Sequence, residues 1–242
     1  MPTQGVQPLP RAFLGEHGKG IAARAAQLLF QLVGTGALLF LCAGSVAWPR
    51  GWLYLAISLA SMVALTIWVL PRNPEVIAAR GRLHRETAGY DKVLLPFYTL
   101  FTAALFVVGA LDNGRFGWAP LSWPWSIAGA GLLLVAMIPV AGAMAVNRNL
   151  ETTMRIQRDR GHTVATEGPY RVVRHPMYAG SLLHFPAIAL VLGSTWALVP
   201  AAGCMVWVVI RTALEDRALH RDLPGYAAWA QRTRYRLVPG VW

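Results

Sequence analysis

Apolar runs alternate with short polar segments along the whole chain. The runs lie at about residues 25–48, 53–70, 93–111, 125–146, 178–192 and 196–210. A helix needs about 20 apolar residues to cross a bilayer, so the first four runs are candidate spans, whereas 178–192 is short for one. We predict an all-α integral membrane helical bundle with about six transmembrane segments, of which the last two form a short hairpin.

The polar segments contain the residues that interrupt helices. Trp48-Pro49-Arg50-Gly51-Trp52 predicts a tight turn at the headgroup level, where tryptophan is enriched. The segment 71–74, with a proline at each end, stops the second run, and residues 75–82 predict a short interfacial helix. Residues 1–20 are polar and rich in Gly and Pro, which predicts a disordered or surface-lying tail.

Composition supports a membrane protein. Of the residues in the chain, 55% are hydrophobic and 14% are charged, whereas about a quarter of the residues of a soluble domain are charged. The net charge of +11 would be compatible with binding to nucleic acid. The charges lie between the apolar runs, however, as they do in membrane proteins. We therefore expect contacts with membrane lipids, no nucleic-acid partner, and a single membrane domain over residues 1–242.

The basic residues predict the orientation of the chain. Of the 22 lysines and arginines, all but Arg50 and Arg115 lie in 1–24, 71–92, 147–177 and 211–242. These segments alternate with the others along the chain, and an excess of Lys and Arg marks the cytoplasmic side. The pattern predicts that both termini are cytoplasmic.

One polar segment, residues 161–180, concentrates side chains that can bind a ligand. It is rich in Gly and Pro, which restrain the backbone, and it carries two histidines and several basic and aromatic residues. Further along, Arg211 and Glu215 stand four residues apart, hence on one helical face at the end of an apolar run. Cys42 and Cys204 lie inside apolar runs without metal-ligand spacing, so we expect no metal site.

These motifs resemble a known family. The residues that carry the resemblance are Gly168-Pro169-Tyr170, Arg174-His175-Pro176-Met177-Tyr178-Ala179-Gly180, Arg211 with Glu215 and Asp216, Pro224-Gly225-Tyr226 and Tyr235-Arg236-Leu237-Val238-Pro239. Their order is similar to that of the isoprenylcysteine carboxyl methyltransferases, whose wider superfamily includes the phospholipid N-methyltransferases. The likeness covers about residues 145–240. It implies that 1–146 supplies the tail and four spans, and 147–242 a methyltransferase-like core.

The resemblance implies an S-adenosyl-L-methionine site on the cytoplasmic side. The positions that would bind the cofactor are His162, Thr163, Val164, Ala165, Tyr170, His175, Pro176, Met177, Tyr178 and Glu215. Arg211 would face the substrate, and we place Arg211 and Arg174 as catalytic candidates. Family members often have paired glutamates where this chain has Glu215-Asp216, which leaves the role of Asp216 open.

The acceptor implied by the resemblance is lipophilic, either a small molecule or a lipidated substrate. A prenylcysteine-type carboxylate needs no base, whereas a phospholipid amine or a thiol must lose a proton. Taken alone, Arg211 and Glu215 could be a surface ion pair, and Tyr226 and Tyr235 are interpreted as interface anchors. A small transporter or scaffold is the non-enzyme alternative, in which His184 would be the main polar group within a span.

Overall fold

The computed structural model describes residues 11–80, 89–152, 157 and 161–242, with the backbone alone for residues 11–17. Every regular element in these ranges is helical, which confirms the all-α prediction. In order they are α1 (Arg11–Ala43), α2 (Pro49–Val69), α3 (Pro74–Arg80), α4 (Gly89–Gly109), η1 (Ala110–Phe116), α5 (Trp123–Val146), η3 (Gly168–Arg171), α6 (Pro176–Leu192), α7 (Leu198–Asp222) and α8 (Tyr226–Arg232).

The predicted spans correspond to helices of the bundle. Within the described ranges, five helices are long and apolar enough to cross a membrane, and they fall at Gly18–Ala43, Pro49–Val69, Gly89–Phe116, Trp123–Val146 and Leu198–Asp222. The sixth apolar helix, α6, has 17 residues, a length of about 25 Å. This is shorter than the roughly 30 Å hydrocarbon core of a bilayer. The structure thus supports an integral membrane bundle.

Helix boundaries differ from the prediction at both ends of the chain. α1 begins at Arg11, inside the segment expected to be a tail, while residues 1–10 lie outside the described part of the chain. The short interfacial helix exists as Pro74–Arg80, and the last two predicted residues also lie outside that part. α7 continues past the end of the apolar run to Asp222, in agreement with the shared helical face predicted for Arg211 and Glu215, and Thr212, Asp216 and Ala218 give its polar end a buried face.

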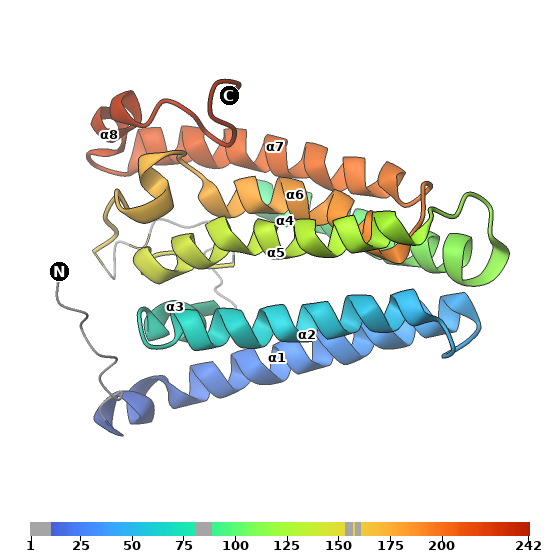
Figure 1. The fold of residues 1–242 in the computed structure, drawn as a ribbon. Helices are drawn as coiled ribbons and strands as arrows, with labels where there is room; N and C mark the ends of the chain where they lie inside the picture. The colour runs from blue at the N-terminus through green and yellow to red at the C-terminus, as the bar shows by residue number, and fades with distance from the viewer. Residues whose placement is uncertain (1–10, 81–88, 153–156, 158–160) are drawn as a thin grey trace.

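The helices run roughly parallel in layers (Figure 1). α1 and α2 lie side by side in one layer, α5 and α6 form the middle, and α7 lies beyond α6. α3, α8 and the segment around η3 are all at the same end of the bundle. Chain segments far apart in sequence therefore meet at this end.

At the opposite end, the chain turns at residues 44–48, and Arg50 directly after this turn belongs to a buried polar network. Arg50 is 6% exposed and donates to the carbonyls of Gly193 and Leu121. Asp112, in the wide π-helical turn η1, accepts hydrogen bonds from the Ser194 hydroxyl and the Ala119 backbone. These bonds tie α2 and η1 to the α6–α7 connection. The predicted turn thus exists but lies at residues 44–48, and residues 49–52, which were expected within it, form the start of α2.

Small residues allow α5 and α6 to pack closely. A Cβ atom added at Gly129 would lie 2.7 Å from the backbone nitrogen of Val191, and one at Gly180 would lie 2.6 Å from the carbonyl oxygen of Ala136. Backbone atoms cannot yield as a flexible side chain can, and small residues of this kind permit close approach of membrane helices.

We expect Gly129→Ala to lower the midpoint of thermal unfolding in detergent, because its methyl group would overpack the α5–α6 contact at a cost of about 1–3 kcal/mol. The matched control is Gly131→Ala on the same helix, where an added Cβ meets no atom within 4 Å. Equal midpoints for the two variants would contradict the close packing.

Candidate active site

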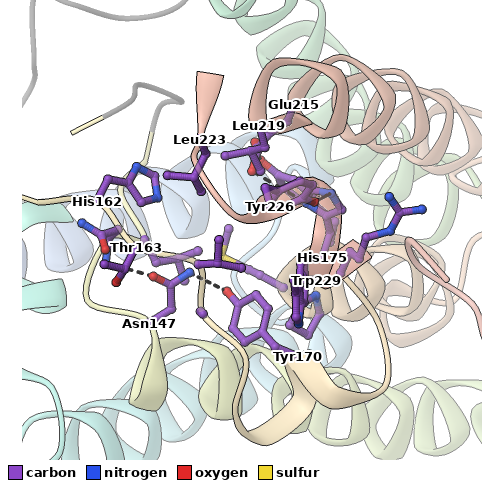
Figure 2. Close-up of a pocket in the computed structure, with 18 of the residues that line it drawn as sticks. Asn147, His162, Thr163, Tyr170, His175, Glu215, Leu219, Leu223, Tyr226 and Trp229 are labelled. Atoms are coloured by element: carbon purple, nitrogen blue, oxygen red, sulfur yellow. Dashed lines mark hydrogen bonds and ion pairs between the residues drawn. The ribbon is translucent and has the colours of Figure 1, made fainter. Parts of the chain in front are cut away.

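A cleft opens at the end of the bundle that carries α3, α8 and the η3 segment. About 80 Å³ of it can hold the centre of a water-sized group. Figure 2 shows His162 and Thr163 on one side of it, Tyr170 and Asn147 on another, and Glu215, Leu219 and Tyr226 on the side of the α7–α8 region. Five separate stretches of chain thus contribute to its wall.

The structure brings every predicted site residue to this cleft. The lining residues include His162, Thr163, Val164, Ala165, Tyr170, Arg174, His175, Pro176, Met177, Tyr178, Arg211 and Glu215. Others that sequence reasoning missed complete the wall, namely Asn147, Asn149, Leu150, Glu151, Leu219, Leu223, Tyr226 and Trp229. Asn147 and Asn149 directly follow the fourth span. Polar side chains at the end of a membrane helix are site candidates, so these two residues could have been predicted from the sequence.

Local sequence restrains the loop that carries half of the site. Gly161 and Gly168 have φ of +60° and +56°, the left-handed region that side chains disfavour. Pro176 begins α6 directly after His175, and proline suits the first helical position because its missing N–H would lack a partner there anyway. The backbone of Arg174 and His175 donates to the carbonyls of Tyr235 and Arg236, so the C-terminal segment fixes this loop.

The buried carboxylate of Asp216 joins the surrounding elements. It is 1% exposed and accepts two hydrogen bonds from Arg174 Nη1, at 3.0 and 3.1 Å. Arg236 Nε and the Tyr226 hydroxyl each donate to it at 2.9 Å, and His175 Nε2 lies 3.3 Å away. Asp216 therefore links α7 to the loop before α6, to α8 and to the C-terminal segment.

These contacts change two interpretations made from the sequence. The guanidinium of Arg174 is held by Asp216 and by the carbonyl of Arg234, which favours a structural role over the expected catalytic one. Tyr226 is 3% exposed and was wrongly interpreted as an interface anchor. Burial, and next the charge of Asp216, raise the pKa of Tyr226, so it remains a neutral donor to that carboxylate.

Glu215, the neighbour of Asp216, faces the cleft. Its carboxylate accepts a hydrogen bond of 2.7 Å from the Tyr178 hydroxyl. Its other oxygen lies 3.8 Å from His175 Nδ1, and the rings of His175 and Tyr178 stack with centroids 5.9 Å apart. The Glu215 side chain keeps 18% of its surface exposed, so it can still accept a hydrogen bond from a ligand.

Arg211 lies on the same helix, but its ion pair is with Asp91 rather than with Glu215. Its Nη2 atom donates to Asp91 at 3.0 Å and to the carbonyl of Thr152 at 3.1 Å. The guanidinium lies 5.5 Å from the centre of the Tyr178 ring, and the buried Nε has no partner in the part of the chain that the structure describes. Among the described residues, one donor of Arg211 is thus buried and unsatisfied, between the rings of Tyr178 and Trp207.

Tyr170, a residue of η3, lines the cleft close to the end of α5. It is 6% exposed, and its hydroxyl oxygen accepts a hydrogen bond of 2.8 Å from the Asn147 side chain. Burial raises the pKa of Tyr170, although the bond from Asn147 acts in the opposite direction. The phenol therefore stays neutral and presents an aromatic surface to the cleft.

Comparison with known proteins identifies the region that carries this site. Residues 125–223 match the model of the phospholipid methyltransferase family. The match confirms the resemblance seen in the sequence at the level of the superfamily that includes the isoprenylcysteine and phospholipid enzymes. It contains nearly all of α5 and the whole of η3, α6 and α7, and with them all of the predicted site residues.

The chain is also similar to a curated bacterial protein, the cobalt-zinc-cadmium resistance protein CzcN of Cupriavidus metallidurans. The two are 32% identical over 131 residues, which is 53% of this chain and 56% of that protein. The chain thus spans little more than half the length of this relative.

We expect Asp216→Asn to lower the stability of the folded protein by about 3 kcal/mol or more, because it leaves the partly buried Arg174 and Arg236 without their counter-charge. Thermal unfolding in detergent measures this loss. The control is Asp222→Asn, six positions further on the same helix, which removes the partner of the exposed Arg221 and should change the midpoint little. A midpoint for Asp216→Asn equal to that of the control would contradict the central role of Asp216.

Proposed function

We propose that the chain is an integral membrane methyltransferase that uses S-adenosyl-L-methionine and methylates a carboxylate on a lipophilic acceptor, of the prenylcysteine type. The observation that supports it most is the meeting of Glu215, Tyr178, His175 and Arg211 in one cleft within the family region. The cleft lies at the foot of the membrane helices, where a water-soluble cofactor and a membrane-borne acceptor can both arrive. The basic segments argue that this end, with both termini, is cytoplasmic.

The side chains of the cleft fit the cofactor chemically. Glu215 can accept from an ammonium group or ribose hydroxyls, and Tyr178 and Tyr170 offer aromatic surfaces to a cation, a contact of about 0.5–2 kcal/mol. In the described chain, the backbone N–H groups of Thr163, Val164 and Ala165 donate to no other backbone carbonyl, so they can bind an adenine or carboxylate.

Arg211 can position the acceptor. The Arg211 guanidinium, whose Nε has no partner among the described residues and which lies 5.5 Å from the centre of the Tyr178 ring, would hold an acceptor carboxylate by a charge-assisted hydrogen bond. When bound, S-adenosylmethionine supplies an electrophilic methyl group, so that a new O–CH3 bond forms while the C–S bond breaks and sulfur keeps the electron pair. A carboxylate is already ionised at neutral pH, so the chain needs only to align the reactants and exclude water.

A phospholipid amine is the second candidate, and the description of the matching family favours it. An amine must lose a proton before or during transfer, and Glu215 and His175 are the nearest groups that could accept it. A carboxylate acceptor would use the same two residues only for binding. The pH dependence of transfer would therefore separate the two acceptors.

We expect Glu215→Ala to weaken the binding of S-adenosylhomocysteine, the product form of the cofactor, by about tenfold or more. Hydrogen bonds to charged groups contribute about 1.5–3 kcal/mol, which supports a change of this size. Calorimetry on the purified protein in detergent measures it. Arg217→Ala, an exposed position two residues away, is the control and should bind normally. Unchanged affinity in Glu215→Ala would remove Glu215 from the cofactor site.

A panel of acceptors tests the reaction. Radiolabelled S-adenosylmethionine is incubated with the protein and farnesylcysteine, phosphatidylethanolamine or a small thiol, and we expect label in an ester of farnesylcysteine. Arg211→Gln should raise the KM for this acceptor about tenfold and leave the affinity for S-adenosylhomocysteine unchanged. Because this change also leaves Asp91 unpaired, the double variant with Asp91→Asn is assayed beside it. Label in phosphatidylethanolamine alone would overturn the carboxylate proposal.

A further inference from the structure

Arg211 and Glu215 lie on one face of α7, but they do not form an ion pair. Residues four apart in a helix are neighbours, with about 5–6 Å between their Cβ atoms. The charge of Glu215 does act on Arg211, yet Arg211 pairs with Asp91, and Glu215 lies closest to His175. A pair between Arg211 and Glu215 would neutralise the charge that Glu215 presents to the cleft. Whatever holds the two side chains apart therefore affects the site.

The first turn of α4 draws Arg211 away from Glu215. Asp91 of this turn is 4% exposed, and its Oδ2 accepts a hydrogen bond of 3.0 Å from Arg211 Nη2. The same nitrogen donates to the carbonyl oxygen of Thr152 at 3.1 Å. A hydrogen bond between a guanidinium and a carboxylate is about twice as strong as one between neutral groups. The direction of the Arg211 side chain is therefore set by acceptors outside its own helix.

Trp207, one turn before Arg211 in α7, keeps α4 in place. Its indole Nε1 donates a hydrogen bond of 2.7 Å to the carbonyl oxygen of Leu94 in α4. The centre of its ring lies 5.1 Å from the Arg211 guanidinium, within the range of a cation–π contact. The start of α4 is thus bonded to α7 at two levels, which holds Asp91 beside Arg211.

Loss of the Asp91 charge would leave Glu215 as a partner within reach of Arg211. The Arg211 side chain is 11% exposed, and a partly buried guanidinium without a counter-charge is costly. Asp216, the other carboxylate of this turn, already accepts hydrogen bonds from two arginines and a tyrosine. Glu215 has no arginine partner, and its side chain keeps 18% of its surface exposed. It would therefore accept the guanidinium that Asp91 no longer holds.

We propose that Asp91 is a positioning residue that keeps Arg211 apart from Glu215, so that Glu215 remains available to the cofactor and Arg211 to the acceptor. This inference rests on the proposed function, which gives these two residues their roles. Residues 125–223, which match the family, contain Arg211 and Glu215, whereas Asp91 lies outside them. The separation of the two charges thus requires α4 in addition to the matching region.

Calorimetry with S-adenosylhomocysteine tests the cofactor side without requiring turnover. Asp91→Asn removes the charge and keeps the shape of the side chain. Arg211 then pairs with Glu215, and we expect the affinity to fall about fivefold. The double variant with Arg211→Gln should bind as tightly as the wild type, because no guanidinium is left to occupy Glu215. Wild-type affinity in Asp91→Asn, or equal affinities of Asp91→Asn and the double variant, would overturn the inference.

Stability is measured in parallel, because Asp91→Asn also leaves a partly buried arginine unpaired. The control is Asp112→Asn at the opposite end of the bundle, where the carboxylate accepts from Ser194 and from the Ala119 backbone. It should lower the midpoint of thermal unfolding and leave the affinity for S-adenosylhomocysteine unchanged. Weaker binding by Asp112→Asn as well would trace the loss to destabilisation and contradict the role of Asp91.

A second variant keeps the test decisive if Asp91→Asn does not fold. Asp91→Glu retains the negative charge beside Arg211 and should bind S-adenosylhomocysteine within about twofold of the wild type. A loss as large as that expected for Asp91→Asn would show that the charge is not what matters at this position, and would overturn the inference.

Methyl transfer to farnesylcysteine tests the acceptor side. Asp91→Asn should raise the KM for farnesylcysteine about fivefold, because an Arg211 that pairs with Glu215 no longer holds the acceptor carboxylate. Added to Arg211→Gln, the same change should raise the KM no further, since Asp91 acts through Arg211. A further rise in the double variant would show an effect of Asp91 that does not pass through Arg211.

The outcomes separate this inference from the proposed function. If Glu215→Ala weakens the binding of S-adenosylhomocysteine and Asp91→Asn does not, the cofactor site stands and the inference is overturned. Normal binding by Glu215→Ala would refute the cofactor site, and with it the role given to Asp91. If the affinities follow the expected pattern but no acceptor of the panel is methylated, the proposed reaction is refuted while the role of Asp91 in cofactor binding stands.

Discussion

The buried carboxylate of Asp216 is the interaction on which the site depends. It neutralises two arginines, accepts from a tyrosine, and lies beside His175, so four chain segments meet at one side chain. A charge that is 1% exposed is tolerated only when it is paired and fully hydrogen-bonded, and here it is. Arg174 and Arg236 have no other carboxylate partner within the described ranges, so the loop before α6 and the C-terminal segment take their places from Asp216.

Glu215 and Asp216 are adjacent, but they face opposite environments. Consecutive residues of an α-helix point about 100° apart around its axis. This rotation directs Asp216 into the cluster beneath α8, while Glu215 reaches Tyr178 and the cleft. The same rotation allows His175 to contact both carboxylates, one at each ring nitrogen. Asp216 therefore stabilises the fold, whereas Glu215 presents its charge to the cleft.

A second cavity lies between α1, α2, α3, α5 and α6. The cleft is built from the region that matches the phospholipid methyltransferase family together with α8, whereas the second cavity also needs α1, α2 and α3, which lie outside that region. The family match therefore covers nearly all of the cleft but only part of the second cavity.

The sequence alone determined the helical membrane class, because long uncharged runs can satisfy their backbone groups in a bilayer only as helices. The motifs of 161–180 and of Arg211 and Glu215, through their resemblance to a known family, also indicated many of the residues that line the cleft, whereas Asn147, Tyr226 and Trp229 were missed. Only the tertiary structure decided the partners: Asp91 rather than Glu215 for Arg211, Asp216 for Arg174, and the burial of Arg50 and Tyr226. These pairings join residues that are distant in sequence, and no periodicity or local propensity encodes the approach of separate helices.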